Sequence, residues 1–144
     1  MPSLAQKLMV SGTLAAALVL PPSGVLAQDS KLSLALNTVQ TEAPNCRLTF
    51  VVENGMGEDI DSLVVEAVLF SKDGGILLMT LFDLEEIPAR VPRVRQFVVP
   101  ATTCENMQTV LINGVQECLP VEDNAKDCQG ALTVSSRTSI EVLG

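Results

Sequence analysis

Residues 46–54 of the chain read CRLTFVVEN, and apolar side chains occupy every second position of this stretch from its first residue through residue 52. Leu48 and Phe50 therefore share one face of an extended strand and Arg47 lies on the other, because successive side chains of a strand point in opposite directions. The stretch runs into NGMG at 54–57, which is a turn signal. It predicts a β-strand of a sheet that buries at least one face.

Extended, apolar segments recur along the rest of the chain. They are expected at 31–37, 62–70, 76–82, 94–99, 109–112, 115–118, 131–135 and 138–143. Turn signals separate several of them, such as KDGG at 72–75, in which glycine supplies the positive φ. The strongest two-residue hairpin signal is Asn113-Gly114, which predicts a reversal that leads back along 115–118. Segment 83–88, DLEEIP, is expected to be either one helical turn or a connection that crosses between sheets.

About eight or nine short strands, without an amphipathic helix of about ten residues or more, are typical of an all-β chain. Together with a long-range disulfide, they predict an immunoglobulin-like antiparallel β-sandwich that is stapled by disulfides. The chain has no Trp to pack on the bridge and no Tyr to form a tyrosine corner, so the expected sandwich is of a generic type. A small closed barrel is the main alternative, which the strand count alone does not exclude.

The first residues, 1–27, are typical of a secretory signal peptide. Lys7 precedes an apolar run at 8–20, and small residues stand at the two positions that a signal peptidase reads before a cut after Ala27. The run is shorter than the about 20 apolar residues of a permanent membrane helix, so a retained anchor is the less favoured alternative. Residues 28–144 then form a single domain that is periplasmic or secreted, with no stable membrane span after cleavage.

The composition is strongly acidic. The chain carries a formal net charge of −8, and the expected leader contains Lys7 but no acidic residue, so the mature protein is still more acidic. Nucleic acid and anionic lipid are not expected as partners, because neutralising phosphates requires clustered Lys and Arg. Solubility is the favoured reason for the acidity.

The four cysteines, Cys46, Cys104, Cys118 and Cys128, all lie in the expected mature domain. An even number in an exported chain favours two disulfides over free thiols, and three pairings are formally possible. Cys118 and Cys128 bracket a short polar segment, 119–127, that is expected to be an irregular loop. We therefore pair these two with each other and Cys46 with Cys104. Zinc is disfavoured because the chain has no histidine and no Cys-x-x-Cys motif.

Several segments resemble a group of secreted bacterial proteins without established function, some of which are labelled only as Tat pathway signal sequence domain proteins. The segments that carry the resemblance are CRLTFVVEN at 46–54, IDSLVVEAVLF at 60–70, PRVRQF at 92–97, VLING at 110–114 and SSRT at 135–138. The resemblance covers most of the expected mature chain and implies the fold and the location, but no activity. The leader departs from the label because it has no Arg-Arg pair, so general secretion is the expected route.

Catalysis is not expected. Because the chain has no histidine, neither a Ser-His-Asp nor a Cys-His arrangement can be assembled. A carboxylate pair such as Glu85 and Glu86, or Asp59 and Asp61, could still hydrolyse a glycoside. A sugar site also commonly uses aromatic platforms, and the chain has no Trp and no Tyr. We expect no enzyme activity and no cofactor.

Arg90, Arg93 and Arg95 form the one concentrated positive feature of this acidic sequence. Arg93 and Arg95 would project from the same strand face, where two guanidinium groups can clamp a carboxylate or a phosphate. The three arginines are therefore a candidate binding face. Internal pairing with Glu66 or Glu53 on a neighbouring strand is the favoured alternative.

Two functional hypotheses follow. The leading one is a non-catalytic interaction module, periplasmic or secreted, that offers an edge strand or a face to another envelope protein. The alternative is a carrier of a small ligand or of calcium that uses acidic loops, with Asp59 and Asp61 as candidate metal ligands. The spacing of these two residues matches no established calcium loop, and solvated acidic turns are the favoured interpretation, so we assign no metal.

Overall fold

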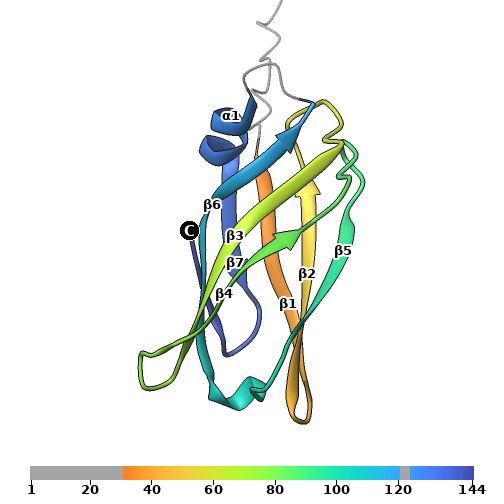
Figure 1. Cartoon of the computed structure of the whole chain (residues 1–144). Coiled ribbons are helices and arrows are strands. Elements are labelled where there is room, and N and C mark those ends of the chain that lie inside the picture. The colour runs from red at the N-terminus through yellow and green to blue at the C-terminus, as the bar shows by residue number, and fades with distance from the viewer. Residues whose placement is uncertain (1–30, 121–123) are drawn as a thin grey trace, which may run out of the picture.

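The structure is a computed structural model that describes residues 31–120 and 124–144 (Figure 1). The signal peptide expected at 1–27 and the start of the expected domain, 28–30, lie outside the described residues. The described part contains eight strands, one short 3-10 helix and one α-helix. In chain order they are β1 (Leu32–Glu42), β2 (Asn45–Asn54), β3 (Ser62–Ser71), β4 (Ile76–Asp83), β5 (Arg93–Val99), η1 (Cys104–Asn106), β6 (Met107–Leu119), α1 (Asn124–Ala131), β7 (Leu132–Ser136) and β8 (Glu141–Leu143).

The strands form two four-stranded sheets. The first sheet has the order β5-β2-β1-β7, and the second sheet has the order β4-β3-β6-β8. Buried side chains from both sheets make one hydrophobic core, with the two sheets on either side of it (Figure 1). An all-β, sandwich-like chain is thereby confirmed.

Both sheets are mixed, so the expectation of a wholly antiparallel sandwich is wrong. β7 pairs in parallel with β1, and β8 pairs in parallel with β6, whereas the other ladders are antiparallel. Parallel neighbours cannot be joined by a tight hairpin. Here the chain changes sheets after β6 and again after β7, so each of the last two strands reaches a neighbour from elsewhere in the sequence. Side-chain alternation identifies a strand but does not give the direction of its neighbour.

Aromatic rings from both sheets meet in the core. Phe50 of β2 is fully buried, and its ring centroid lies 5.8 Å from that of Phe82 on β4 and 6.2 Å from that of Phe97 on β5. The rings of Phe82 and Phe97 stack with centroids 4.1 Å apart. Three of the four phenylalanines thus lie between the two sheets, whereas the fourth, Phe70, lies elsewhere.

The hairpin expected at Asn113-Gly114 is wrong, because both residues lie inside the continuous strand β6. Pairing with β3 shifts register at this point, which is typical of a β-bulge. The Val115 backbone N–H donates to the side-chain Oε1 of Gln129 on α1 at 2.7 Å. Nδ2 of Asn113 donates at 3.0 Å to the carboxylate of Glu66, an expected arginine partner. Tertiary contacts therefore use this dipeptide as a bulge rather than as a turn.

The disulfides pair as predicted, Cys46 with Cys104 and Cys118 with Cys128. The first bridge links β2 of the first sheet to η1, which leads directly into β6 of the second sheet. The second bridge links the end of β6 to α1. The prediction of an irregular loop at 119–127 is therefore wrong for residues 124–127, which belong to α1.

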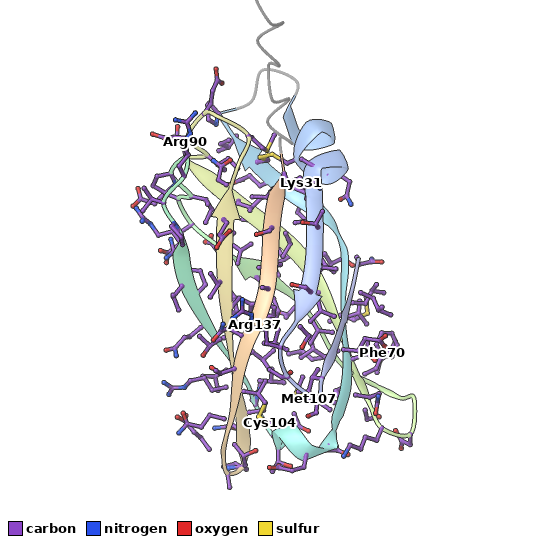
Figure 2. The ribbon with its side chains drawn as sticks, turned by 180° about the vertical axis from the view of Figure 1, so that it is seen from behind. Lys31, Phe70, Arg90, Cys104, Met107 and Arg137 are labelled. Atoms are coloured by element: carbon purple, nitrogen blue, oxygen red, sulfur yellow. A yellow bond between two sulfur atoms is a disulfide. The ribbon has the colours of Figure 1, made fainter. Side chains whose placement is uncertain are left out.

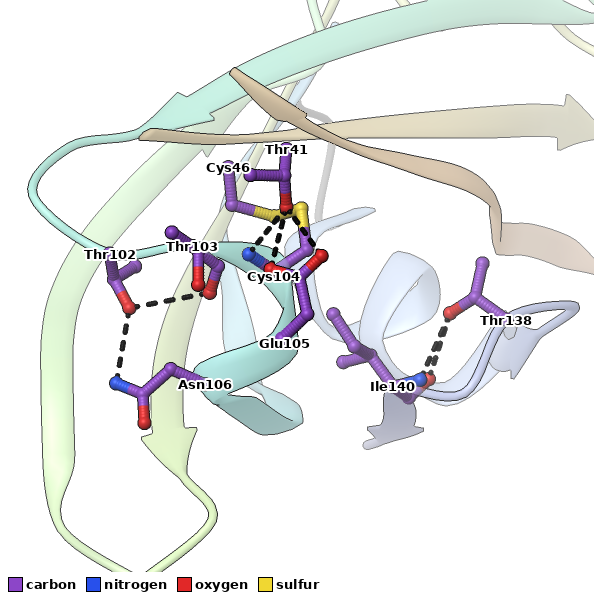
Figure 3. The surroundings of a disulfide bond; sticks show 9 residues. All are labelled: Thr41, Cys46, Thr102, Thr103, Cys104, Glu105, Asn106, Thr138 and Ile140. Carbon is purple, nitrogen blue, oxygen red and sulfur yellow. Dashed lines mark hydrogen bonds between the residues drawn. A yellow bond between two sulfur atoms is a disulfide. The ribbon is translucent and has the colours of Figure 1, made fainter. Parts of the chain in front are cut away.

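Polar groups surround the bridge between Cys46 and Cys104 (Figure 3). Oγ1 of Thr41 accepts a hydrogen bond from the Cys104 backbone N–H at 3.1 Å and donates to the Glu105 carboxylate at 2.9 Å. Hydrogen bonds from the backbone N–H of Glu105 and from the hydroxyls of Thr41 and Thr103 lower the pKa of the Glu105 carboxyl. Thr41 thus connects the hairpin between β1 and β2 to the start of η1.

Candidate functional site

The three arginines of the candidate binding face have different surroundings in the structure. Arg90 lies in the loop between β4 and β5, where its φ is 63° and its backbone N–H donates to the Asn54 carbonyl oxygen at 2.9 Å. It lines a groove of about 370 Å³ near Lys31, at one end of the molecule (Figure 2). Arg93 and Arg95 lie on β5 at alternate positions and share one side of the strand, as predicted.

Arg95 bonds to carbonyl groups of the loop between β4 and β5. Its Nε–H donates to the Leu84 carbonyl oxygen at 2.6 Å, and one Nη–H donates to the Glu86 carbonyl oxygen at 3.0 Å. Its guanidinium also pairs with the Glu85 carboxylate at 3.4 Å, and only 16% of its side chain is exposed. Arg93 pairs with the Glu86 carboxylate at 3.9 Å. These arginines are therefore engaged within the chain, and the loop supplies their partners instead of a neighbouring strand.

Replacement of Arg95 by alanine is expected to lower the free energy of unfolding by about 2 kcal/mol, because three charge-assisted hydrogen bonds to the main-chain carbonyls of Leu84, Val94 and Glu86 are lost. The matched control is Arg93→Ala on the same strand face, with an expected loss of about 0 to 1 kcal/mol, since its single ion pair joins an exposed carboxylate. Urea unfolding of both variants measures the difference. Equal losses would show that the carbonyl contacts of Arg95 add nothing to stability.

The acidic candidates Asp59 and Asp61 differ, because Asp59 bonds through its carboxylate to a neighbouring loop and Asp61 bonds through its backbone to the end of β6. Oδ1 of Asp59 accepts a hydrogen bond from the Ala89 backbone N–H at 2.7 Å, and the Asp61 backbone N–H donates to the Leu119 carbonyl oxygen at 2.5 Å. Within residues 31–120 and 124–144, no group of three or more His, Cys, Asp or Glu side chains is placed to hold a metal ion. The observed role of Asp59 is structural.

One apolar row crosses all four strands on the outer face of the second sheet. Val65, Ala67 and Leu69 of β3 belong to the core, so Val68 and Phe70 at the alternate positions lie on the outer face, where Val68 is 5% exposed and Phe70 is partly exposed. Backbone pairing places Val68 beside Met79 of β4 on one side and beside Leu111 of β6 on the other. Leu111 in turn lies beside Leu143 of β8. Side chains opposite each other on neighbouring strands project from the same face, so these residues form one row across the sheet.

Neighbouring positions widen this row. Ile76 of β4 pairs with Phe70, which lies at the margin of the molecule in Figure 2, and Leu81 follows Met79 on the same side of β4. The exposed fractions are 60% for Ile76, 59% for Met79, 57% for Leu81 and 45% for Leu143. The surface made by these residues is called the apolar face from here on. Its members are Val68, Phe70, Ile76, Met79, Leu81, Leu111 and Leu143.

The outer face of the first sheet differs. Its outward positions are mainly polar and include Ser33, Arg47, Thr49, Glu53, Gln96, Thr133 and Ser135. Val94 and Val98 are also exposed there, with Gln96 between them on the same side of β5. Val94 pairs with Val51, which pairs with Ala35, but the next residue of this row is Ser135, so the apolar row of the first sheet ends before β7. Single exposed apolar side chains are normal on a soluble protein, whereas a contiguous group marks an interaction surface. The apolar face is therefore the stronger candidate for a functional site.

The sequence contains a signal for the apolar face in residues 62–70, SLVVEAVLF. Alternation assigns Leu63, Val65, Ala67 and Leu69 to the core, but Val64, Val68 and Phe70 at the intervening positions are apolar as well. A strand that is apolar on both sides is either buried on both faces or offers one face to a partner. In the structure Val64 and Phe70 on this second side are partly exposed, whereas Val68 is only 5% exposed.

No helix in the described part of the chain is long and apolar enough to cross a bilayer. The two disulfides fit an oxidising environment of the kind found outside the cytoplasm. Comparisons of the chain with protein-family models, with curated proteins and with solved structures gave no match.

Proposed function

We propose that the chain is a non-catalytic interaction module of the cell envelope, periplasmic or secreted, that binds another envelope protein through the apolar face. The observation that carries the proposal is the apolar row from Met79 to Leu143, which crosses all four strands of the second sheet. The same proposal includes an immunoglobulin-like domain of the secreted group that the sequence resembles. Disulfides and a sandwich-like architecture support this assignment.

The composition of the apolar face suits protein recognition. Protein interfaces are enriched in aromatic residues and Met at their core and are surrounded by a polar rim. Here Phe70 and Met79 belong to the apolar face, and the carboxylates of Glu66 on β3 and Glu141 on β8 lie at its margin. Carboxylates at the rim favour a partner with basic groups around an apolar centre.

The test changes both ends of the apolar face while leaving the core intact. Ile76→Asp combined with Leu143→Asp is expected to reduce recovery of the cross-linked envelope partner at least tenfold, because burying a carboxylate in an apolar interface is unfavourable. The measurement is cross-linking in intact cells, recovery of the tagged protein and titration with the purified partner.

The matched control is Val94→Asp combined with Val98→Asp, two exposed valines on the outer face of the first sheet. This control carries the same charge change and the same number of strand substitutions, so it is expected to retain the partner. Equal recovery with the two double variants contradicts the proposal. Absence of any reproducible partner of the unaltered protein contradicts it as well.

A further inference from the structure

The described sheets have four edge strands, β5 and β7 in the first sheet and β4 and β8 in the second. An edge strand presents unpaired backbone groups that can pair with another strand, and natural proteins block such edges with charges, proline or short length. β5 has inward-pointing Arg93 and Arg95 and follows Pro92. β8 has three residues, and β7 has five with exposed Thr133 and Ser135.

β4 has a β-bulge near its start, where its pairing with β3 shifts register at Leu77, but it has none of these protections over the rest of its length. Residues 76–82 read ILLMTLF, without charge, proline or glycine, and Asp83 follows at the end of the strand. Met79 and Leu81 are more than half exposed. A long, uncharged and apolar edge is a site of strand pairing rather than a neutral surface.

From this contrast we infer that β4 pairs antiparallel with β4 of a second copy of this chain, which joins the two second sheets into one continuous sheet. A two-fold axis at Thr80 places Met79 of each copy opposite Leu81 of the other, with Thr80 opposite Thr80. Apolar cross-strand pairs and Thr–Thr pairs are both favourable. The existing ladder between β3 and β4 is continued by one more strand.

The absence of charge over its centre makes the β4 edge compatible with a second copy, unlike the edges β5 and β8, and β4 is longer than β7, which is also uncharged. Two chains of net charge −8 repel each other, so self-association requires a contact without charge. Self-pairing of β5 would bring Arg93 and Arg95 of both copies together. Self-pairing of β4 about Thr80 brings uncharged residues together over its centre, and Asp83 meets Leu77 of the other copy.

This inference goes beyond the proposed function, and its test is independent of it. Thr80 points away from the apolar face, and Ile76 and Leu143, which test partner binding, lie outside the expected pairing of 77–83. A monomer that still binds an envelope partner overturns the inference alone. A dimer that binds none overturns the proposed function alone.

The experiment measures the mass of the mature, disulfide-bonded protein by light scattering and sedimentation over a range of concentrations. The unaltered protein is expected to be a dimer, and Thr80→Lys is expected to raise the dimer dissociation constant at least tenfold, since it places two ammonium groups at the axis. The substitution introduces the kind of inward charge that β5 already has. Thr133→Lys on the edge strand β7 is the matched control and is expected to leave the dimer intact.

Hydrogen exchange provides a second measurement that needs no variant. Backbone amides of 77–83 at the open edge of β4 are expected to exchange more slowly at high protein concentration than at low concentration, and those of β7 at equal rates. A monomeric mass at all concentrations, or equal dissociation constants of the two lysine variants, overturns the inference. Protection of β4 only after a different protein is added overturns it too, because the edge then accepts that protein's strand.

Discussion

Replacement of Phe50 by alanine is expected to lower the free energy of unfolding by about 3 to 5 kcal/mol, the range for aromatic-to-alanine changes in cores. Phe50 is fully buried on β2, between β5 and β1 in the first sheet. Its ring meets Phe82 of the opposite sheet and Phe97 of the neighbouring strand. Removing it leaves a cavity and also separates two ring contacts that hold the sheets together. Urea unfolding followed by circular dichroism measures the loss.

Phe70→Ala is the matched control, because it removes the same atoms from the outer face of the second sheet. Phe70 is partly exposed and does not contact the rings of Phe50, Phe82 and Phe97 in the core. The free energy of unfolding is therefore expected to fall by only about 1 to 2 kcal/mol in this variant. The two values distinguish core packing from a general effect of losing a phenylalanine. Equal losses of unfolding free energy in the two variants would show that the contacts between the rings of Phe50, Phe82 and Phe97 do not stabilise the core.

Local pattern was sufficient to predict most strands. Alternation in 46–54 predicts β2, with Leu48 and Phe50 buried and Arg47 outside the core, as observed. The KDGG turn at 72–75 and the hairpin that it closes are also confirmed. These features depend on neighbours within a few residues, so the sequence contains the information directly.

Features that depend on distant partners could not be predicted in this way. Asn113-Gly114 has the composition of a tight turn, yet Gln129 and Glu66 bond to its surroundings and keep β6 continuous. The parallel pairing of β7 with β1 joins strands from opposite ends of the described chain. In both cases a long-range contact outweighs local preference, which only a three-dimensional arrangement shows.

The candidate functional sites also depend on contacts between residues that are distant in the sequence. The arginines stand out in an acidic sequence, but Arg95 finds its partners in the carbonyl groups of Leu84 and Glu86. The apolar face has no charge to draw attention, and its row is assembled from four separate strands. Val68 and Leu111 become neighbours only through the register between β3 and β6. Sequence alone could indicate that 62–70 is apolar on both sides, but not which residues extend that surface.

The combined change Cys46→Ala and Cys104→Ala is expected to lower the free energy of unfolding by about 4 kcal/mol in the chain-entropy model. The two cysteines are separated by 58 positions, and closing so long a loop restricts the unfolded chain strongly. The bridge also links the two sheets through η1, where the Cys104 N–H bonds to Thr41. Urea unfolding of the variant and of the unaltered protein, without reductant, measures the loss from the two midpoints and slopes.

The second bridge is an internal control. Cys118 and Cys128 are separated by 10 positions, so Cys118→Ala with Cys128→Ala is expected to cost about 3 kcal/mol, less than the first pair. This second bridge holds α1 against the end of β6. Its removal does not affect the link between the two sheets, which the first bridge makes. Loss of the first bridge should therefore also raise hydrogen exchange in β2 and β6, whereas loss of the second should raise it mainly in α1. The opposite ranking of the two losses would show that native contacts around α1, rather than restriction of the unfolded chain, determine what each disulfide contributes.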